Sequence, residues 1–275
     1  MLTMDSEAIP NDRAARRRAA CLPASAQATH RRVILLKERN LAMLKQDLIL
    51  RNPLRLLGYD SDDILEPGQF GAVLARAGVG KTALVIQIAL NTMLRGKNVL
   101  HISLNEPVGK VAIWYKEVLG RLAHQYQVPH LDRLWDTIVG HRFIMTFQVE
   151  GFSAPKLEER LTDLTSQGIF TPHLIIIDGQ PFYPEGHGAL DELKRLAQKL
   201  GLPIWFTVTT HRHEAPAPDG LPIQLSPVQA LFDVAIALQP VENAIHIKAL
   251  KGCHLSENQP PLVLDPATML IQGHA

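Results

Sequence analysis

The segment from Ala75 to Thr82 combines the residue types that hold phosphate groups, between an apolar run and an uninterrupted helical pattern. Gly78 and Gly80 allow backbone amides to turn inward around phosphate oxygens, and the following helix adds about half an elementary charge at its N-terminus. The ammonium of Lys81 would reach the β- and γ-phosphates of a nucleoside triphosphate. The segment therefore fits the Walker A pattern, with alanine for the first glycine. The predicted nucleotide-binding residues are Ala75, Arg76, Ala77, Gly78, Val79, Gly80, Lys81 and Thr82.

An acidic residue at the end of a later apolar run could hold Mg²⁺ beside this loop. Four apolar residues, Leu174 to Ile177, precede Asp178, which lies 97 residues after Lys81. A carboxylate at the tip of a buried strand is typical of the Walker B element, which binds magnesium. The same sequence also occurs where an aspartate only caps the next turn, so the assignment depends on the Walker A loop. With that pairing, Thr82 and Asp178 are the predicted magnesium ligands.

Hydrolysis needs a further carboxylate that orients the attacking water. The position after Asp178 is Gly179, which has no side chain for this purpose. The other common location is the end of the strand after the Walker A helix, where the chain reads Ser-Leu-Asn-Glu-Pro from Ser103. Glu106 is available there as a general base. We therefore predict Glu106 and Lys81 as the catalytic residues.

Short apolar runs alternate with helical patterns through the middle of the chain. This alternation predicts an α/β fold with a mostly parallel sheet covered by helices on both faces. A proline-rich loop, Glu214–Pro227, precedes an antiparallel hairpin that closes the sheet, with its turn at Pro240–Asn243. The predicted strands are Ala72–Leu74, Val99–Leu104, Phe143–Phe147, Leu174–Ile177, Ile204–Val208, Val234–Leu238 and Ala244–Ala249, and the predicted helices are Thr82–Leu94, Val108–Tyr126, Pro155–Thr165 and Ala189–Leu200.

The remaining N-terminal part divides into two predicted segments. Residues 1–30 mix charge, proline and small residues without periodicity, which is typical of a flexible basic tail. Residues 31–56 would hold an amphipathic helix, from about Val33 to Leu50, and a linker. Residues 57–275 would form the nucleotide-binding domain. Its core is plausible because 46% of the 275 residues are hydrophobic and 20% are charged.

Charge and cysteine content restrict the class of protein. The formal net charge of +1 gives no overall field that would attract nucleic acid or membrane. The two cysteines, Cys21 and Cys253, provide no disulfide framework and no spaced metal set, so we expect a reducing cytoplasm. No apolar run approaches the roughly 18 residues of a membrane span.

The order of these motifs resembles that of RecA-type P-loop ATPases, closest to the KaiC-like and replicative-helicase-like branch. The resemblance covers roughly Leu57 to Ile271. Its pieces are Pro67-Gly68, the Walker A loop, the strand ending at Ser103–Glu106, the Walker B strand, the helix Asp191–Leu200, Thr209-Thr210-His211, Phe232-Asp233-Val234 and the lysine-bearing hairpin strand.

The resemblance implies roles for several residues outside the two Walker motifs. Glu106 would polarise the water, and Thr210 or His211 would sense the γ-phosphate. Lys248 or Lys251 would reach the nucleotide of a neighbouring subunit. The resemblance thus implies a homo-oligomer, either a ring such as a hexamer or a filament.

The expected function is Mg²⁺-dependent binding of ATP and its hydrolysis to ADP and phosphate. Asn105 stands where many relatives carry the catalytic glutamate, or the first of two adjacent acids. This residue favours a second hypothesis, a nucleotide-loaded regulatory or scaffold protein with little hydrolysis. A third hypothesis, a DNA recombination or replication accessory, needs a basic surface. The loop Glu214–Pro227 has no lysine or arginine, and the basic residues cluster only in the arm with Arg13, Arg16, Arg17, Arg18, Arg31 and Arg32.

Overall fold

The computed structural model of the chain describes residues 42–49, 63–129, 131–182, 187–211, 214–252 and 262–272. The predicted tail and the predicted boundaries at residues 30 and 56 lie outside these ranges, so the three-part division stays a prediction. Residues 42–49 are helical, within the segment for which the sequence predicts a helix. None of the described helices is long and apolar enough to cross a membrane.

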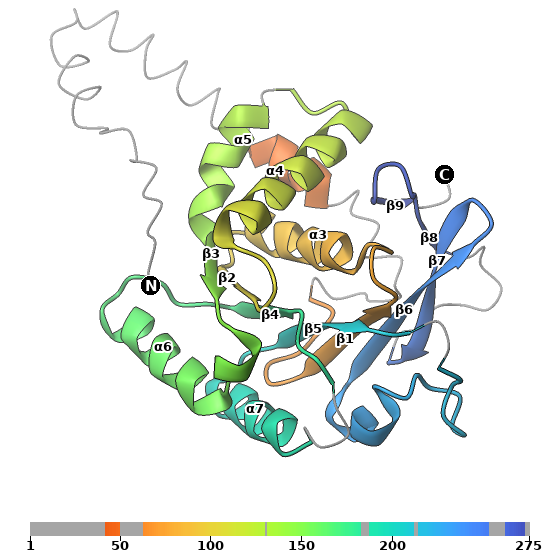
Figure 1. Ribbon diagram of the computed structural model, residues 1–275. Coiled ribbons are helices and arrows are strands. Elements are labelled where there is room, and N and C mark those ends of the chain that lie inside the picture. Colours follow the sequence, from red (N-terminus) through yellow and green to blue (C-terminus); the bar gives the residue numbers. More distant parts are fainter. Residues whose placement is uncertain are drawn as a thin grey trace, which may run out of the picture. The chain divides into compact units, whose positions relative to one another are not determined.

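One nine-stranded sheet organises the chain from residue 63 onward (Figure 1). Its spatial order is β3-β2-β4-β5-β1-β6-β7-β8-β9. The first six of these strands are parallel, and the last three pair in antiparallel fashion. The strands are β1 Phe70–Ala75, β2 Val99–Ser103, β3 Arg142–Thr146, β4 Leu174–Asp178, β5 Ile204–Thr209, β6 Val234–Val241, β7 Ala244–Lys251, β8 Val263–Leu264 and β9 Ile271–Gln272.

Helices cover both faces of this sheet. Figure 1 shows α3, α4 and α5 on one face and α6 and α7 on the other. The predicted α/β fold, with a mostly parallel sheet and a C-terminal antiparallel hairpin, is confirmed. The helices are α3 Lys81–Leu94, α4 Val108–Gln125, α5 Leu131–Ile138, α6 Ala154–Ser166 and α7 His187–Leu200, and the 3₁₀ turns are η2 Val139–His141, η3 Val149–Gly151 and η5 Ser226–Leu231.

The central strands are apolar because both of their faces are covered. Every residue of β1, β2 and β4 is buried, which explains why these runs are continuous instead of alternating. Three phenylalanine rings, of Phe70, Phe206 and Phe232, pack with centroids 4.9–5.6 Å apart in the core. Because β1, β2, β4 and β5 run parallel, their carboxyl ends share one edge of the sheet. Ligands bind at this edge in open α/β folds.

Some elements differ from the sequence prediction. The hairpin strands extend to Val241 and Lys251, so the turn is Glu242–Asn243 instead of Pro240–Asn243. Glu242 has a φ of 52°, the left-handed conformation that a two-residue turn requires. Helix α5 and the strands β8 and β9 are absent from the prediction. Strands of two residues are too short to produce a periodic pattern.

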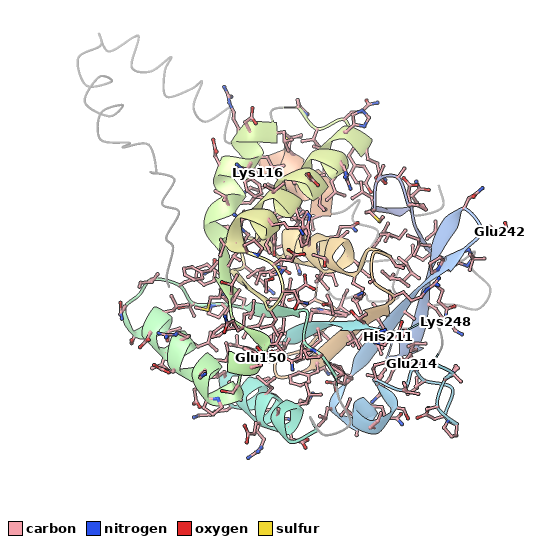
Figure 2. All side chains as sticks on the ribbon, in the orientation of Figure 1. Lys116, Glu150, His211, Glu214, Glu242 and Lys248 are labelled. Carbon is pink, nitrogen blue, oxygen red and sulfur yellow. The ribbon has the colours of Figure 1, made fainter. Side chains whose placement is uncertain are left out.

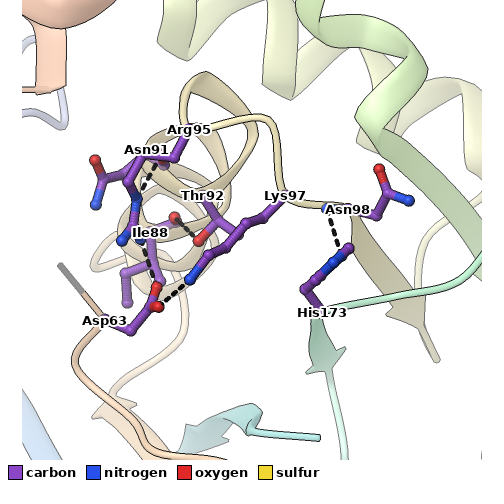
Figure 3. Close-up of polar contacts among 8 residues, drawn as sticks. All are labelled: Asp63, Ile88, Asn91, Thr92, Arg95, Lys97, Asn98 and His173. Carbon is purple, nitrogen blue, oxygen red and sulfur yellow. Dashed lines mark hydrogen bonds and ion pairs between the residues drawn. The ribbon is translucent and has the colours of Figure 1, made fainter.

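An ionic cluster fixes the far end of α3, at the edge of the sheet opposite the carboxyl ends (Figure 3). Asp63 accepts a hydrogen bond from Arg95 Nη2 at 2.6 Å and also pairs with Lys97. Burial alone would raise the pKa of Asp63, but the hydrogen bond from Lys97 and the charge of Arg95 lower it overall. The cluster borders a cavity of about 250 Å³ that Ile88 and Trp205 also line. Asp63 therefore ties the chain before β1 to the end of α3.

Gly71 tests the packing of β1 against β5. A Cβ at Gly71 would stand 2.6 Å from the indole of Trp205, its partner on β5. We expect Gly71→Ala to lower the free energy of unfolding by about 1–3 kcal/mol because the neighbours must move apart. Urea unfolding followed by circular dichroism measures this.

Gly120 in α4 provides the control. A Cβ there would meet nothing closer than Leu131 Cδ2 at 3.9 Å. Gly120→Ala should raise the free energy of unfolding by about 0.5–1 kcal/mol, the usual gain from replacing glycine inside a helix. A Gly71→Ala protein as stable as wild type would contradict the described β1–β5 contact.

Candidate active site

The predicted Walker A residues form the turn between β1 and α3. Gly78 and Gly80 adopt positive φ angles of 78° and 110°, which favour glycine. No atom lies within 4 Å of the position that a Cβ on Gly78 would take, so this side of the loop is open. Gly80, the N-cap of α3, supplies no side-chain hydrogen bond to the first turn, and that turn has no acidic residue. The helix N-terminus is therefore suited to an anionic ligand.

Lys81 folds back over this loop. Its Nζ donates to Ala75 O at 3.0 Å and to Arg76 O at 3.1 Å. Burial lowers the pKa of Lys81, and the nearby carboxylate of Asp178 partly opposes this shift. The ammonium is thus held by two carbonyl oxygens that phosphate oxygens could replace as acceptors.

Thr82 and Asp178, the two predicted magnesium ligands, lie in direct contact. Thr82 Oγ1 donates to Asp178 Oδ2 at 3.0 Å. Asp178 ends β4 and is 8% exposed. A hydroxyl and a carboxylate beside a phosphate-binding loop are the oxygen ligands that Mg²⁺ takes. The residues present therefore fit a magnesium ion at this position, and their role as its ligands stays a prediction.

Thr207 on β5 is a partner of Asp178 that the sequence prediction missed. Its Oγ1 donates to Asp178 Oδ1 at 2.5 Å and accepts a hydrogen bond from Gly179 N at 2.9 Å. A threonine inside the apolar run Ile204–Val208 was the available signal. Only the β4–β5 register shows that this side chain faces Asp178.

His101 on β2 is a second missed neighbour of Asp178. Its Nδ1 lies 3.1 Å from the hydroxyl of Tyr115 on α4, and its Nε2 lies 3.9 Å from Asp178 Oδ2. The side chain is fully buried. Burial lowers the pKa of His101 to about 4, with the carboxylate of Asp178 opposing the shift and Arg142 adding to it. Burial also raises the pKa of Tyr115. Both groups are therefore neutral near pH 7.

The two residues after β2 point to different places. A Cβ at Gly179 would stand 2.3 Å from Asn105 Nδ2, so Asn105 lies against the residue next to Asp178. The backbone amide of Glu106 donates to Ser103 Oγ at 3.0 Å, and its Oε1 accepts from Lys110 Nζ at 2.8 Å. The predicted general base is thus paired with a lysine on α4, and the asparagine is nearer to the Walker B carboxylate.

The predicted sensor residues follow β5 at the same edge. Thr210 N donates to Ala75 O at 3.0 Å, which places it beside the start of the Walker A loop. His211 is exposed where the chain leaves the sheet (Figure 2). The structure thus brings Thr210 to the loop and gives His211 no contact with it.

The two predicted trans-acting lysines differ in their surroundings. Lys251 Nζ donates to Gln229 O at 2.8 Å, within the same chain. Lys248 on β7 is exposed (Figure 2). Lys248 is therefore the better candidate for contact with a neighbouring subunit.

The loop before β6 is ordered by one carboxylate. Asp219 accepts hydrogen bonds from Ser226 Oγ at 2.7 Å, from Leu221 N at 3.0 Å and from Gln229 Nε2 at 2.9 Å. The bond from Ser226 is the main reason why the pKa of Asp219 is lowered. This loop has its own internal structure and no basic side chain, which does not favour strong contact with nucleic acid.

The C-terminal strands buttress the Walker A loop, a feature that the sequence prediction missed. A Cβ at Gly80 would stand 2.7 Å from Leu264 Cδ2 and 3.2 Å from Met269 Sδ. Gln87 on α3 donates through Nε2 to Met269 O at 2.9 Å and accepts from Ile271 N at 3.1 Å. The turn between β8 and β9 therefore sets one wall of the loop.

Comparison with known proteins agrees with this architecture. The solved ATPase domain of a replicative helicase matches with a TM-score of 0.51 and 15% sequence identity, over 73% of this chain and 81% of that chain. The chain has a RecA-like P-loop NTPase fold. Neither a family model nor a curated protein matches the sequence. At this identity the likeness establishes the RecA-like fold and transfers no residue role.

The burial of His101 predicts a pH dependence of stability for this RecA-like domain. The ordinary pKa of histidine is 6.5, and that of His101 in the folded protein is about 4. Between these values the unfolded chain binds the proton more readily, so stability is present above pH 6.5 and is lost as pH falls. We expect His101 to contribute a loss of about 2 kcal/mol between pH 7 and pH 5.

Urea unfolding of wild type and His101→Gln at both pH values measures this contribution. The difference between the two pH values should be smaller in His101→Gln by about the amount that His101 contributes. A wild-type protein and a variant with the same pH dependence would show that His101 titrates normally in the folded state.

Proposed function

We propose that this protein binds ATP with Mg²⁺ at the Walker A loop and hydrolyses it to ADP and phosphate. The contact between Thr82 Oγ1 and Asp178 Oδ2, at 3.0 Å, carries the proposal. It joins two oxygen ligands from separate elements directly beside the open side of a phosphate-binding loop. A glycine-rich turn formed by chance would have no reason to carry a buried carboxylate at this position.

Each residue would act on the phosphates through an ordinary electrostatic contact. The amides around Gly78 and Gly80 would hold phosphate oxygens, and Lys81 would exchange its two carbonyl acceptors for the β- and γ-phosphates. Thr82 and Asp178 would hold magnesium, which when bound neutralises part of the phosphate charge. Glu106 would orient water after its carboxylate leaves Lys110.

One observation favours a second candidate, a nucleotide-loaded regulatory or scaffold protein with little hydrolysis. The amide of Asn105 cannot accept a proton, yet it lies nearer to Asp178 than the paired carboxylate of Glu106 does in the contacts described above. If Glu106 stays with Lys110, ATP would be held intact. The two candidates share the binding site and differ only in turnover.

The wider context of the proposal follows the motif order. We place the protein in the KaiC-like and replicative-helicase-like branch and propose a cytoplasmic homo-oligomer, a ring or a filament. The exposed ammonium of Lys248 supports a cross-subunit contact, because Lys251 is already bonded within its own chain. The role of a DNA recombination or replication accessory has less support, since the ordered loop Glu214–Pro227 carries no basic residue.

Nucleotide binding should depend on the ammonium of Lys81. Lys81→Ala removes the main side-chain charge near the β- and γ-phosphates, so ATP affinity should fall tenfold or more, about 1.4 kcal/mol at least. Calorimetric titration with a non-hydrolysable ATP analogue measures the affinity. Lys199→Ala is the matched control, because Lys199 pairs with Glu158 on the surface, away from the loop. Unchanged affinity in a folded Lys81→Ala protein would refute the assignment of the loop.

Turnover should depend on Glu106 and respond to Lys110. Glu106→Gln keeps the shape and loses the charge, so phosphate release should fall about 10²–10⁴-fold, with ATP affinity little changed. Lys110→Met should not lower turnover, because it removes only the partner that holds Glu106. If wild type releases phosphate no faster than Glu106→Gln and retains intact ATP for hours, the regulatory candidate is correct and hydrolysis is excluded.

A further inference from the structure

One buried polar atom beside the proposed metal site is unexplained by the contacts described so far. His101 Nε2 has no hydrogen-bond partner among the described residues, although the side chain is fully buried. It lies 3.9 Å from Asp178 Oδ2, which is beyond hydrogen-bond distance. An unsatisfied buried polar group is costly, so its retention calls for a reason.

The neighbours of His101 decide which ring nitrogen carries the proton. If the hydroxyl of Tyr115 donates to Nδ1, the proton of His101 is on Nε2 and faces the carboxylate of Asp178. The opposite arrangement would direct the Nε2 lone pair at that negative charge. It would also leave the Tyr115 hydroxyl to find another acceptor. The first arrangement has the lower electrostatic energy, so the neutral ring presents an Nε2–H group to Asp178.

The other donor to the same oxygen is a residue with two roles. Thr82 Oγ1 donates its proton to Asp178 Oδ2 in this structure. A hydroxyl oxygen that ligates a cation must direct its lone pair at the cation and its proton elsewhere. Asp178 Oδ2 would then lose the donor that holds it, while Thr207 continues to hold Oδ1.

We propose that His101 is a positioning residue for Asp178, whose Nε2–H group takes over Oδ2 when Thr82 turns to magnesium. A rotation that closes the present 3.9 Å separation by about 1 Å would form a hydrogen bond of ordinary length. Such outer partners fix the orientation of metal-binding carboxylates. This inference rests on the proposed magnesium–ATP function.

The position of the proton can be tested without any ligand. We would record ¹H–¹⁵N spectra of the protein labelled with ¹⁵N at its histidine rings and identify His101 by its loss in His101→Gln. The expected result is a proton on Nε2 and none on Nδ1. A proton on Nδ1 would overturn the proposal, whether or not the protein binds nucleotide.

The effect on magnesium can be tested with a matched pair of variants. The side-chain amide nitrogen of His101→Gln stands near the position of Nε2, whereas that of His101→Asn stands near Nδ1 and leaves Oδ2 without a donor. Magnesium is titrated calorimetrically into protein loaded with a non-hydrolysable ATP analogue. We expect His101→Asn to bind Mg²⁺ about tenfold more weakly and His101→Gln to stay near wild type.

Two outcomes separate this inference from the proposed function. If wild type binds the analogue and Mg²⁺ but both variants bind Mg²⁺ equally well, His101 only packs against Tyr115 and the inference fails alone. If wild type binds neither, both the inference and the proposed function fail. Tyr115→Phe is the control for lost packing polarity, because it removes the hydroxyl and leaves the Nε2 position filled.

Discussion

The side chain of Asp178 is the one carboxylate that the described part of the core buries, and the architecture around it follows from that. A buried charge is stable only when donors surround it. Thr82 comes from the Walker A helix and Thr207 from β5, so the carboxylate joins α3, β4 and β5 at one edge. The same contacts that satisfy the charge bring a hydroxyl and a carboxylate to the phosphate-binding loop. Stability and the proposed function therefore use the same hydrogen bonds.

The Walker A helix is held at both of its ends. At its N-terminus, Leu264 and Met269 fill the space beside Gly80, and Gln87 bonds the backbone on both sides of this turn. At its C-terminus, Asp63 pairs with Arg95 and Lys97. A loop that must present its amides to a ligand without collapsing needs such support, because its glycines have the most conformational freedom to lose. The antiparallel strands β8 and β9 thus contribute to the site although they are far from it in sequence.

The distinction between an ATPase and a nucleotide-loaded regulator depends on a small local difference. Asn105 and Glu106 are adjacent on the turn after β2, and successive residues of an extended chain point in different directions. The residue that lies against Gly179 is the neutral one, and the carboxylate reaches Lys110 on α4. An exposed ion pair of this kind contributes about 0–1 kcal/mol, so bound nucleotide could readily displace it. The described contacts are therefore consistent with a base that becomes available only in the loaded state.

The sequence by itself determined the fold class, the Walker A loop and the candidate pair of Thr82 and Asp178. Local signals were sufficient there, because glycine spacing and continuous apolar strands reflect short-range constraints on the backbone. The tertiary structure alone decided which side chains meet. The register of β4 against β2 and β5 places His101 and Thr207 at Asp178, and the β8–β9 turn reaches Gly80 across a long stretch of chain. No periodic pattern encodes such contacts, because they depend on how strands align in space and not on their neighbours in sequence.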